Sequence, residues 1–105
     1  MKKLFCEVYD NDRFSKELIL EFINKTEGIA VKNGSPEPAD IIFADLDSNE
    51  PNMSFDRLQS QLIIISSDKK HIHSLFQDKI TDYLHKPDLS YERFLVSIDK
   101  VRKKA

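Results

Sequence analysis

Acidic residues directly follow two apolar segments of strand length. The first segment, LFCEVY, runs into Asp10, and the second, IIFAD, ends in Asp45. Carboxylates that gather in one place repel one another, and a hard divalent cation such as Mg²⁺ is the usual remedy. A carboxylate beside such a cation can act as a nucleophile, so we predict this role for Asp45. The candidate metal ligands after the first segment are Asp10, Asn11 and Asp12.

Two further apolar segments end in groups that suit phosphoryl transfer. LIIIS ends in Ser66, a hydroxyl donor, and DYLHKP contains Lys86, a cation able to pair with a phosphoryl oxygen. Transfer of a phosphoryl group to a carboxylate depends mainly on positioning and on neutralisation of charge. An aspartate nucleophile, a metal ion, a hydroxyl and a lysine supply both, so the sequence favours transfer of a phosphoryl group to Asp45.

Strand and helix patterns alternate along the chain, and the elements that they predict would have to position these groups. Continuous or nearly continuous apolar runs predict three strands, and two weaker runs predict two more. Helical spacing predicts a first helix with Phe14, Leu18 and Phe22 on its buried face, a face that Ile19 and Ile23 widen, and with Asn11 or Asp12 as its cap. It also predicts a last helix capped by Ser90. The predicted strands cover residues 4–9, 28–31, 41–46, 62–66 and 80–84, and the predicted helices cover residues 12–25, 52–59, 68–79 and 90–105.

This alternation is typical of α/β proteins with a parallel sheet and right-handed crossovers. In such a sheet the functional crevice lies outside the carboxyl ends of the strands, so we expect Asp45, Ser66 and Lys86 at one edge. The linker NGSPEPA, residues 33–39, departs from the pattern, because its two prolines exclude a helix of ordinary length. We therefore predict a sheet in which one crossover lacks its helix.

The composition limits the size and class of the protein. A chain of 105 residues with 40% hydrophobic content is expected to form one domain, residues 1–105. A net charge of -2, with both signs scattered along the chain, argues against a nucleic-acid surface. No apolar run approaches the roughly 18 residues that cross a membrane, and the start of the chain lacks a signal-peptide cleavage pattern. We expect a cytoplasmic domain that binds neither nucleic acid nor membranes.

Taken together, the motifs resemble those of receiver domains of two-component response regulators. DIIFADLD resembles the phosphoacceptor strand of the family, and YDND resembles the acidic pair after its first strand. Ser66 stands where the family has its conserved hydroxyl, and DYLHKP contains the conserved Lys-Pro. The segment DYLHKPDLSYERFLVSIDKV is similar to receivers that precede LytTR-type DNA-binding domains. The likeness extends over essentially the whole chain.

The resemblance implies a flavodoxin-like (CheY-like), doubly wound α/β fold with five parallel strands in the order 2-1-3-4-5. The linker NGSPEPA indicates that the second helix of this fold is missing or vestigial. It implies that a histidine kinase or a phosphotransfer protein donates the phosphoryl group. It also implies that the backbone carbonyl of Asp47 joins the Mg²⁺ ligands, and that Tyr83 is an aromatic switch that turns inward. A downstream protein partner would bind through residues 69–104. No output domain is expected, and no turnover beyond gain and loss of the chain's own phosphoryl group.

Departures from the family pattern keep other interpretations open. Asn11 stands where an acid that binds the metal directly is usual, and a neutral amide oxygen weakens Mg²⁺ binding. SNEPNMSF replaces the usual Met-Pro and Gly, and NGSPEPA replaces the second helix. The alternative is a degenerate receiver that binds a protein partner, or a second copy of itself, without phosphorylation. A nucleotide- or flavin-binding protein is disfavoured, because no glycine-rich turn follows any predicted strand.

Overall fold

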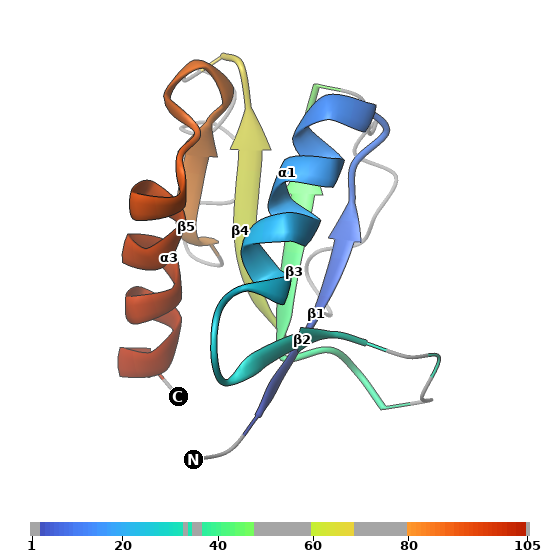
Figure 1. Cartoon of the computed structure of the whole chain (residues 1–105), viewed down its shortest axis with the longest axis vertical. Coiled ribbons are helices and arrows are strands. Elements are labelled where there is room, and N and C mark those ends of the chain that lie inside the picture. The colour runs from blue at the N-terminus through green and yellow to red at the C-terminus, as the bar shows by residue number, and fades with distance from the viewer. Residues whose placement is uncertain (1–2, 33, 35–36, 48–59, 69–79, 105) are drawn as a thin grey trace.

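The computed structural model describes residues 3–32, 34, 37–47, 60–68 and 80–104. Five parallel strands form one sheet in the order β2-β1-β3-β4-β5, which confirms the predicted flavodoxin-like topology. Figure 1 shows the arrowheads of β1, β3, β4 and β5 pointing toward the same edge of the sheet. The strands are β1 (Leu4–Tyr9), β2 (Ile29–Val31), β3 (Ile41–Asp45), β4 (Gln61–Ser66) and β5 (Ile80–His85).

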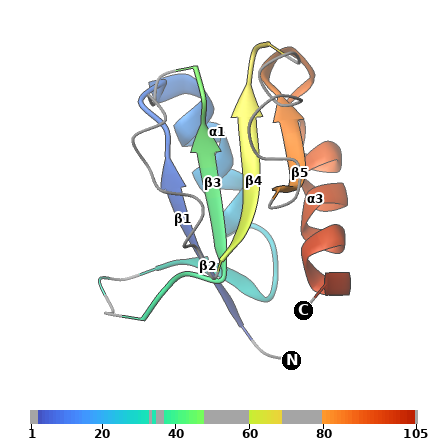
Figure 2. The same cartoon turned by 180° about the vertical axis from the view of Figure 1, so that it is seen from behind.

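The helices α1 (Arg13–Asn24) and α3 (Tyr91–Lys104) lie on the same face of the sheet (Figures 1 and 2). Each begins at the predicted cap: the side chain of Asp12 accepts from the backbone N–H of Phe14, and Ser90 Oγ accepts from that of Arg93. A short 3-10 turn, η2 (Lys86–Asp88), joins β5 to α3. The helices predicted at 52–59 and 68–79 fall outside the described residues. Among the residues described, no helix is long and apolar enough to cross a membrane.

The link from β2 to β3 contains no helix in its described residues, which are 32, 34 and 37–40. Gly34 adopts a φ of 60°, a left-handed conformation that glycine reaches without steric cost. The link is fastened to β1 by Asp40, whose carboxylate accepts from the backbone N–H of Phe5 at 2.8 Å and whose own N–H donates to the Phe5 carbonyl at 2.8 Å. These bonds let the chain pass from the edge strand to the other side of β1.

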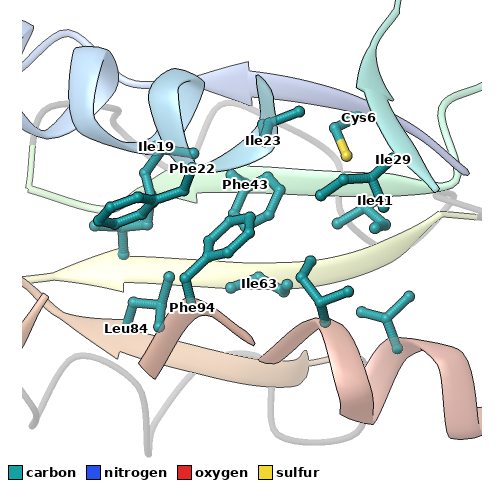
Figure 3. Close-up of a cluster of buried hydrophobic side chains, with 13 residues drawn as sticks. Cys6, Ile19, Phe22, Ile23, Ile29, Ile41, Phe43, Ile63, Leu84 and Phe94 are labelled. Carbon is teal, nitrogen blue, oxygen red and sulfur yellow. The ribbon is translucent and has the colours of Figure 1, made fainter. Parts of the chain in front are cut away.

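The main core lies between the sheet and the two helices. Phe94 of α3 is central to it, with ring centroids 5.4 Å from Phe22 of α1 and 5.6 Å from Phe43 of β3 (Figure 3). Such aromatic pairs contribute about 0.5–1.5 kcal/mol each beyond their burial. The opposite face of the sheet is buried as well, which explains why β3 and β4 are apolar throughout. The buried residues of that second face are Ala39, Ile42, Ala44, Leu62 and Ile64.

The buried face of α1 differs from the predicted face in the first turn of the helix. The prediction that Phe14 belongs to the core is wrong, because 78% of its surface is exposed. Ser15 takes the inward position in this turn, since its hydroxyl donates to a carboxylate oxygen of the buried Asp10. The buried face then continues through Ile19 and Phe22 at helical spacing. Phe14 is left on the surface in the first turn of the helix.

An ion-pair network fastens α3 to β5. Asp82 of β5 is only 6% exposed and accepts two hydrogen bonds from Arg93, at 2.9 and 3.0 Å. Lys100 and Ser97 donate to the same carboxylate. Burial disfavours the charged form of Asp82, but these donors outweigh that effect and lower its pKa to about 2. The network holds in place the strand that leads into Lys86.

We predict that the folded state loses stability as the pH falls from about 4 to about 2. An unfolded aspartate has a pKa of about 3.9, whereas that of Asp82 in the fold is about 2. A lowered folded-state pKa contributes stability above the unfolded value, and the contribution is lost as the pH falls through the folded value. A difference of this size corresponds to about 2–3 kcal/mol. Urea unfolding between pH 2 and pH 6 measures this loss of stability. If the stability of Asp82→Asn depended on pH as strongly as that of wild type, the prediction would be wrong.

Candidate functional site

The carboxyl edge of the sheet gathers residues that the sequence analysis selected. Asp45 is the last residue of β3, Ser66 is the last residue of β4, and Lys86 directly follows β5. The segment after β1 contributes the buried Asp10 and the helix cap Asp12. Because β1, β3, β4 and β5 are neighbours in this order, their carboxyl ends bring the polar groups to one place.

The ammonium group of Lys86 lies among three carboxylates. Its Nζ is 3.0 Å from Asp45 Oδ2, 3.2 Å from Asp12 Oδ2 and 3.2 Å from Asp47 Oδ2. Burial would lower the pKa of this lysine, but the hydrogen bonds to the three carboxylates outweigh burial and raise the pKa above its ordinary value. Lys86 therefore carries a permanent positive charge beside the candidate nucleophile.

The side chain of Asp45 has no exposed surface. Its Oδ2 faces Lys86, and its Oδ1 accepts the backbone N–H of Asp47 at 3.0 Å. Both oxygens are thus engaged by hydrogen-bond donors. The Asp45 carboxylate is therefore buried and hydrogen-bonded through both of its oxygens.

Asp10 interacts with Asp45, and the pKa of Asp10 is raised. Burial is the main cause, and the contact with Asp45 adds to it. Hydrogen bonds from the Ser15 hydroxyl and from the backbone N–H of Asp12 oppose the rise. Two carboxyl groups in contact disfavour a second negative charge. Additional positive charge near this pair would offset the repulsion between the two carboxyl groups.

The carboxylate of Asp47 meets donors from two neighbouring strand ends. Its Oδ1 accepts from Ser66 Oγ at 3.0 Å, and its Oδ2 accepts from the backbone N–H of Ser67 at 2.9 Å. Burial would raise the pKa of Asp47, but the hydrogen bonds from Ser67, Ser66 and Lys86 outweigh it and lower the pKa to about 2. The family resemblance implied a role only for the backbone carbonyl of Asp47, so these contacts of its side chain were not predicted.

The donor chemistry of the site suits Mg²⁺, which prefers carboxylate and carbonyl oxygens. Within the part of the chain that the structure describes, however, no three acidic, histidine or cysteine side chains are grouped so that they could hold a metal ion. Lys86 supplies the positive charge among the carboxylates in this arrangement. Asn11 lies next to Asp10 in the chain, and its side chain is exposed. A Mg²⁺ site on these residues stays a prediction.

Tyr83 lies apart from this cluster, within β5. It is paired in register with Ile64 and packs against the buried cluster on the face opposite α1 and α3. Its backbone carbonyl accepts a hydrogen bond from Arg93 at 3.0 Å. These contacts do not test the predicted role of Tyr83 as a switch.

Two residues that donate hydrogen bonds at the site, Ser15 and Ser67, were not predicted from the sequence. Ser15 could have been found, because a polar residue at helical spacing from Ile19 and Phe22 marks a polar contact on a buried face. Ser67 contributes its backbone N–H, which every residue except proline carries, so its residue type gives no signal.

Comparisons with known proteins support the fold. No family model matches the sequence, and no curated protein matches it. The response regulator domain of Thermotoga maritima CheB is similar in structure, with a TM-score of 0.65 and 16% identity over 97% of this chain and 96% of that domain. A solved chain described as the yeast Spc42 trimeric coiled coil fused to another structure matches with a TM-score of 0.74 and 11% identity, covering 99% of this chain and 80% of that one. At these identities the likeness shows a fold like that of a response regulator receiver domain.

Proposed function

We propose that this chain accepts a phosphoryl group on Asp45 from the phosphohistidine of a histidine kinase or phosphotransfer protein, and that it signals through altered binding of a protein partner. The observation that carries the proposal is the 3.0 Å contact between Lys86 Nζ and Asp45 Oδ2, beside the strand end that carries Ser66. An ammonium group and a hydroxyl near a buried carboxylate supply the neutralisation that phosphoryl transfer needs. The fold that the chain shares with the CheB domain supports the same function.

The proposed reaction requires no general base, because Asp45 reacts as a carboxylate. A lone pair on its oxygen attacks phosphorus, a P–O bond forms, and the P–N bond to the donor imidazole breaks with its electron pair remaining on nitrogen. Lys86 can transfer its hydrogen bond from the carboxylate to a phosphoryl oxygen, and Ser66 can donate its hydroxyl hydrogen to another. Both residues offset the repulsion between an anionic donor and an anionic acceptor.

When bound, Mg²⁺ would neutralise further negative charge on the phosphoryl oxygens. Asp10 and Asp45 would hold it, together with the backbone carbonyl of Asp47. Asn11 and Asp12, which follow Asp10 in the chain, are the other candidate ligands. The contact between the carboxyl groups of Asp10 and Asp45 supports this assignment, because a cation would offset the repulsion between them.

The substitution Asp45→Asn tests the acceptor. Wild type is expected to gain one phosphoryl group from a phosphohistidine protein or a small acyl phosphate, as intact-protein mass spectrometry would show. The variant is expected to gain none, because an amide oxygen is a poor nucleophile. Asp99→Asn is the matched control, since it removes one negative charge from an exposed position of α3 and should leave uptake unchanged. Uptake by Asp45→Asn at the wild-type level would refute the assignment.

A second candidate function is binding of a partner without phosphorylation. The observation that favours it is the Asp47 carboxylate, which already accepts from Ser66, Ser67 and Lys86. A site filled in this way can hold one conformation without a phosphoryl group. Absence of uptake from every donor, together with equal partner binding by wild type and Asp45→Asn, would favour this function over the first.

We place the proposed partner surface on residues 69–104, of which the structure describes 80–104. On α3, Leu95 is 38% exposed and Val96 is 47% exposed. Lys100 and Arg102 are less suitable for testing this surface, because Lys100 binds Asp82 and Arg102 donates to the backbone carbonyl of Glu27. Substitutions of Leu95 and Val96 would test the surface with less disturbance of the fold.

A further inference from the structure

We infer that Asp47 is a built-in anion that occupies the position of the phosphoryl oxygens and must leave it before a phosphoryl group can bind. The inference rests on the proposed function, since it concerns control of the same site. Asp47 would act as a gate through its side chain, in addition to any role of its backbone carbonyl.

The first observation is the set of donors around the Asp47 carboxylate. A hydroxyl from Ser66, a backbone amide from Ser67 and an ammonium group from Lys86 lie at 3.0, 2.9 and 3.2 Å from its oxygens. They come from the ends of two different strands, β4 and β5, so tertiary structure brings them together. Hydroxyl, amide and ammonium donors that converge in this way form a binding position for an oxyanion. A carboxylate of the chain itself fills that position.

The second observation is the burial of the acceptor beneath these groups. The Asp45 side chain is 0% exposed, while that of Asp47 is 23% exposed and that of Lys86 is 16% exposed. The backbone N–H of Asp47 donates to Asp45 Oδ1, whereas the side chain of Asp47 contacts Ser66, Ser67 and Lys86. Rotation of the Asp47 side chain toward solvent would take one acceptor away from each of Ser66, Ser67 and Lys86. It would leave the backbone contact to Asp45 in place.

Occupancy by Asp47 lowers the apparent affinity for any external anion. The apparent dissociation constant rises in inverse proportion to the fraction of molecules in which the position is open. If Asp47 fills the position about nine-tenths of the time, its removal should strengthen binding about tenfold. The same removal should raise the rate of phosphoryl uptake at donor concentrations that do not saturate the site.

The test uses beryllofluoride with Mg²⁺ as the probe, titrated into the full chain and followed by backbone amide NMR. We expect Asp47→Ala to bind the probe about tenfold more tightly than wild type. Asp47→Asn should bind with intermediate affinity, because its amide is uncharged yet can still accept a hydrogen bond. Asp99→Asn, the charge-matched control on α3, should bind like wild type. Asp45→Ala should abolish binding, alone and combined with Asp47→Ala.

A second measurement distinguishes failure of the Asp47 gate from failure of the proposed function. Without Mg²⁺ or beryllofluoride, the Ser67 amide resonance should move in Asp47→Ala and stay in place in Asp99→Asn, because only the first loses the 2.9 Å hydrogen bond. An unmoved Ser67 amide in Asp47→Ala would overturn the inference. Equal probe affinity in wild type and Asp47→Ala, with Asp45 still required, would overturn the gate and leave the phosphoacceptor standing. A moved Ser67 amide with no probe binding by any variant that retains Asp45 would overturn both.

Discussion

Replacing Asp82 by alanine is expected to lower the free energy of unfolding by about 3 kcal/mol. The carboxylate accepts hydrogen bonds from Arg93, Ser97 and Lys100, and its side chain is 4% exposed. Its removal would leave the Ser97 hydroxyl, which is buried, and the Arg93 guanidinium without this acceptor. The cost lies at the low end of the range for buried pairs, because the side chains of Arg93 and Lys100 are 33% and 49% exposed and regain water.

Urea unfolding at pH 7 measures this loss. Asp99→Ala is the control, since Asp99 pairs with Lys103 on the exposed surface of the same helix and should cost less than about 1 kcal/mol. The loss of stability in Asp82→Asn should lie between those of Asp82→Ala and Asp99→Ala, because the asparagine removes the charge and retains a hydrogen-bond acceptor. Equal losses in Asp82→Ala and Asp99→Ala would mean that the network does not hold α3 to the sheet.

The fold could be predicted from the sequence because its signals are local. Continuous apolar runs identified β3 and β4 as strands buried on both faces, and Asp12 and Ser90 marked where the helices begin. The inward residue of the first turn of α1 could not be predicted from periodicity alone. A shift of one residue exchanges Phe14 for Ser15 on the inward face, and the hydrogen bond from Ser15 to Asp10, a tertiary contact, decides between them.

The site was predictable in part, for a topological reason. Strand-end residues of a parallel sheet meet at one edge, so chain order alone placed Asp45, Ser66 and Lys86 together. The direction of the Asp47 side chain depends on the turn after β3, and the Ser67 donor is a backbone group. Neither the spacing nor the types of residues determine such contacts. The same limit explains why the network around Asp82 was not foreseen.

Removal of the charge at Lys86 is expected to slow phosphoryl uptake and to strengthen Mg²⁺ binding. In Lys86→Met the side chain keeps its length and loses its ammonium group. The rate of phosphoryl uptake on Asp45 should fall about 100-fold or more, the usual cost of losing one donor to a developing or transferred oxyanion. Affinity for Mg²⁺ should rise, because three carboxylates lose the cation that now lies 3.0 to 3.2 Å from them.

Both effects can be measured on one preparation, with uptake followed by intact-protein mass spectrometry and Mg²⁺ binding followed by amide NMR. Lys103→Met, on the exposed surface of α3, is the matched control and should change neither quantity. A folded Lys86→Met variant that takes up the phosphoryl group at the wild-type rate would contradict the proposed chemistry. Weaker Mg²⁺ binding in that variant would show that Lys86 does not compete with a metal ion. Opposite movement of the two quantities is expected only if the lysine both assists transfer and takes the place of a cation, as its position among Asp12, Asp45 and Asp47 implies.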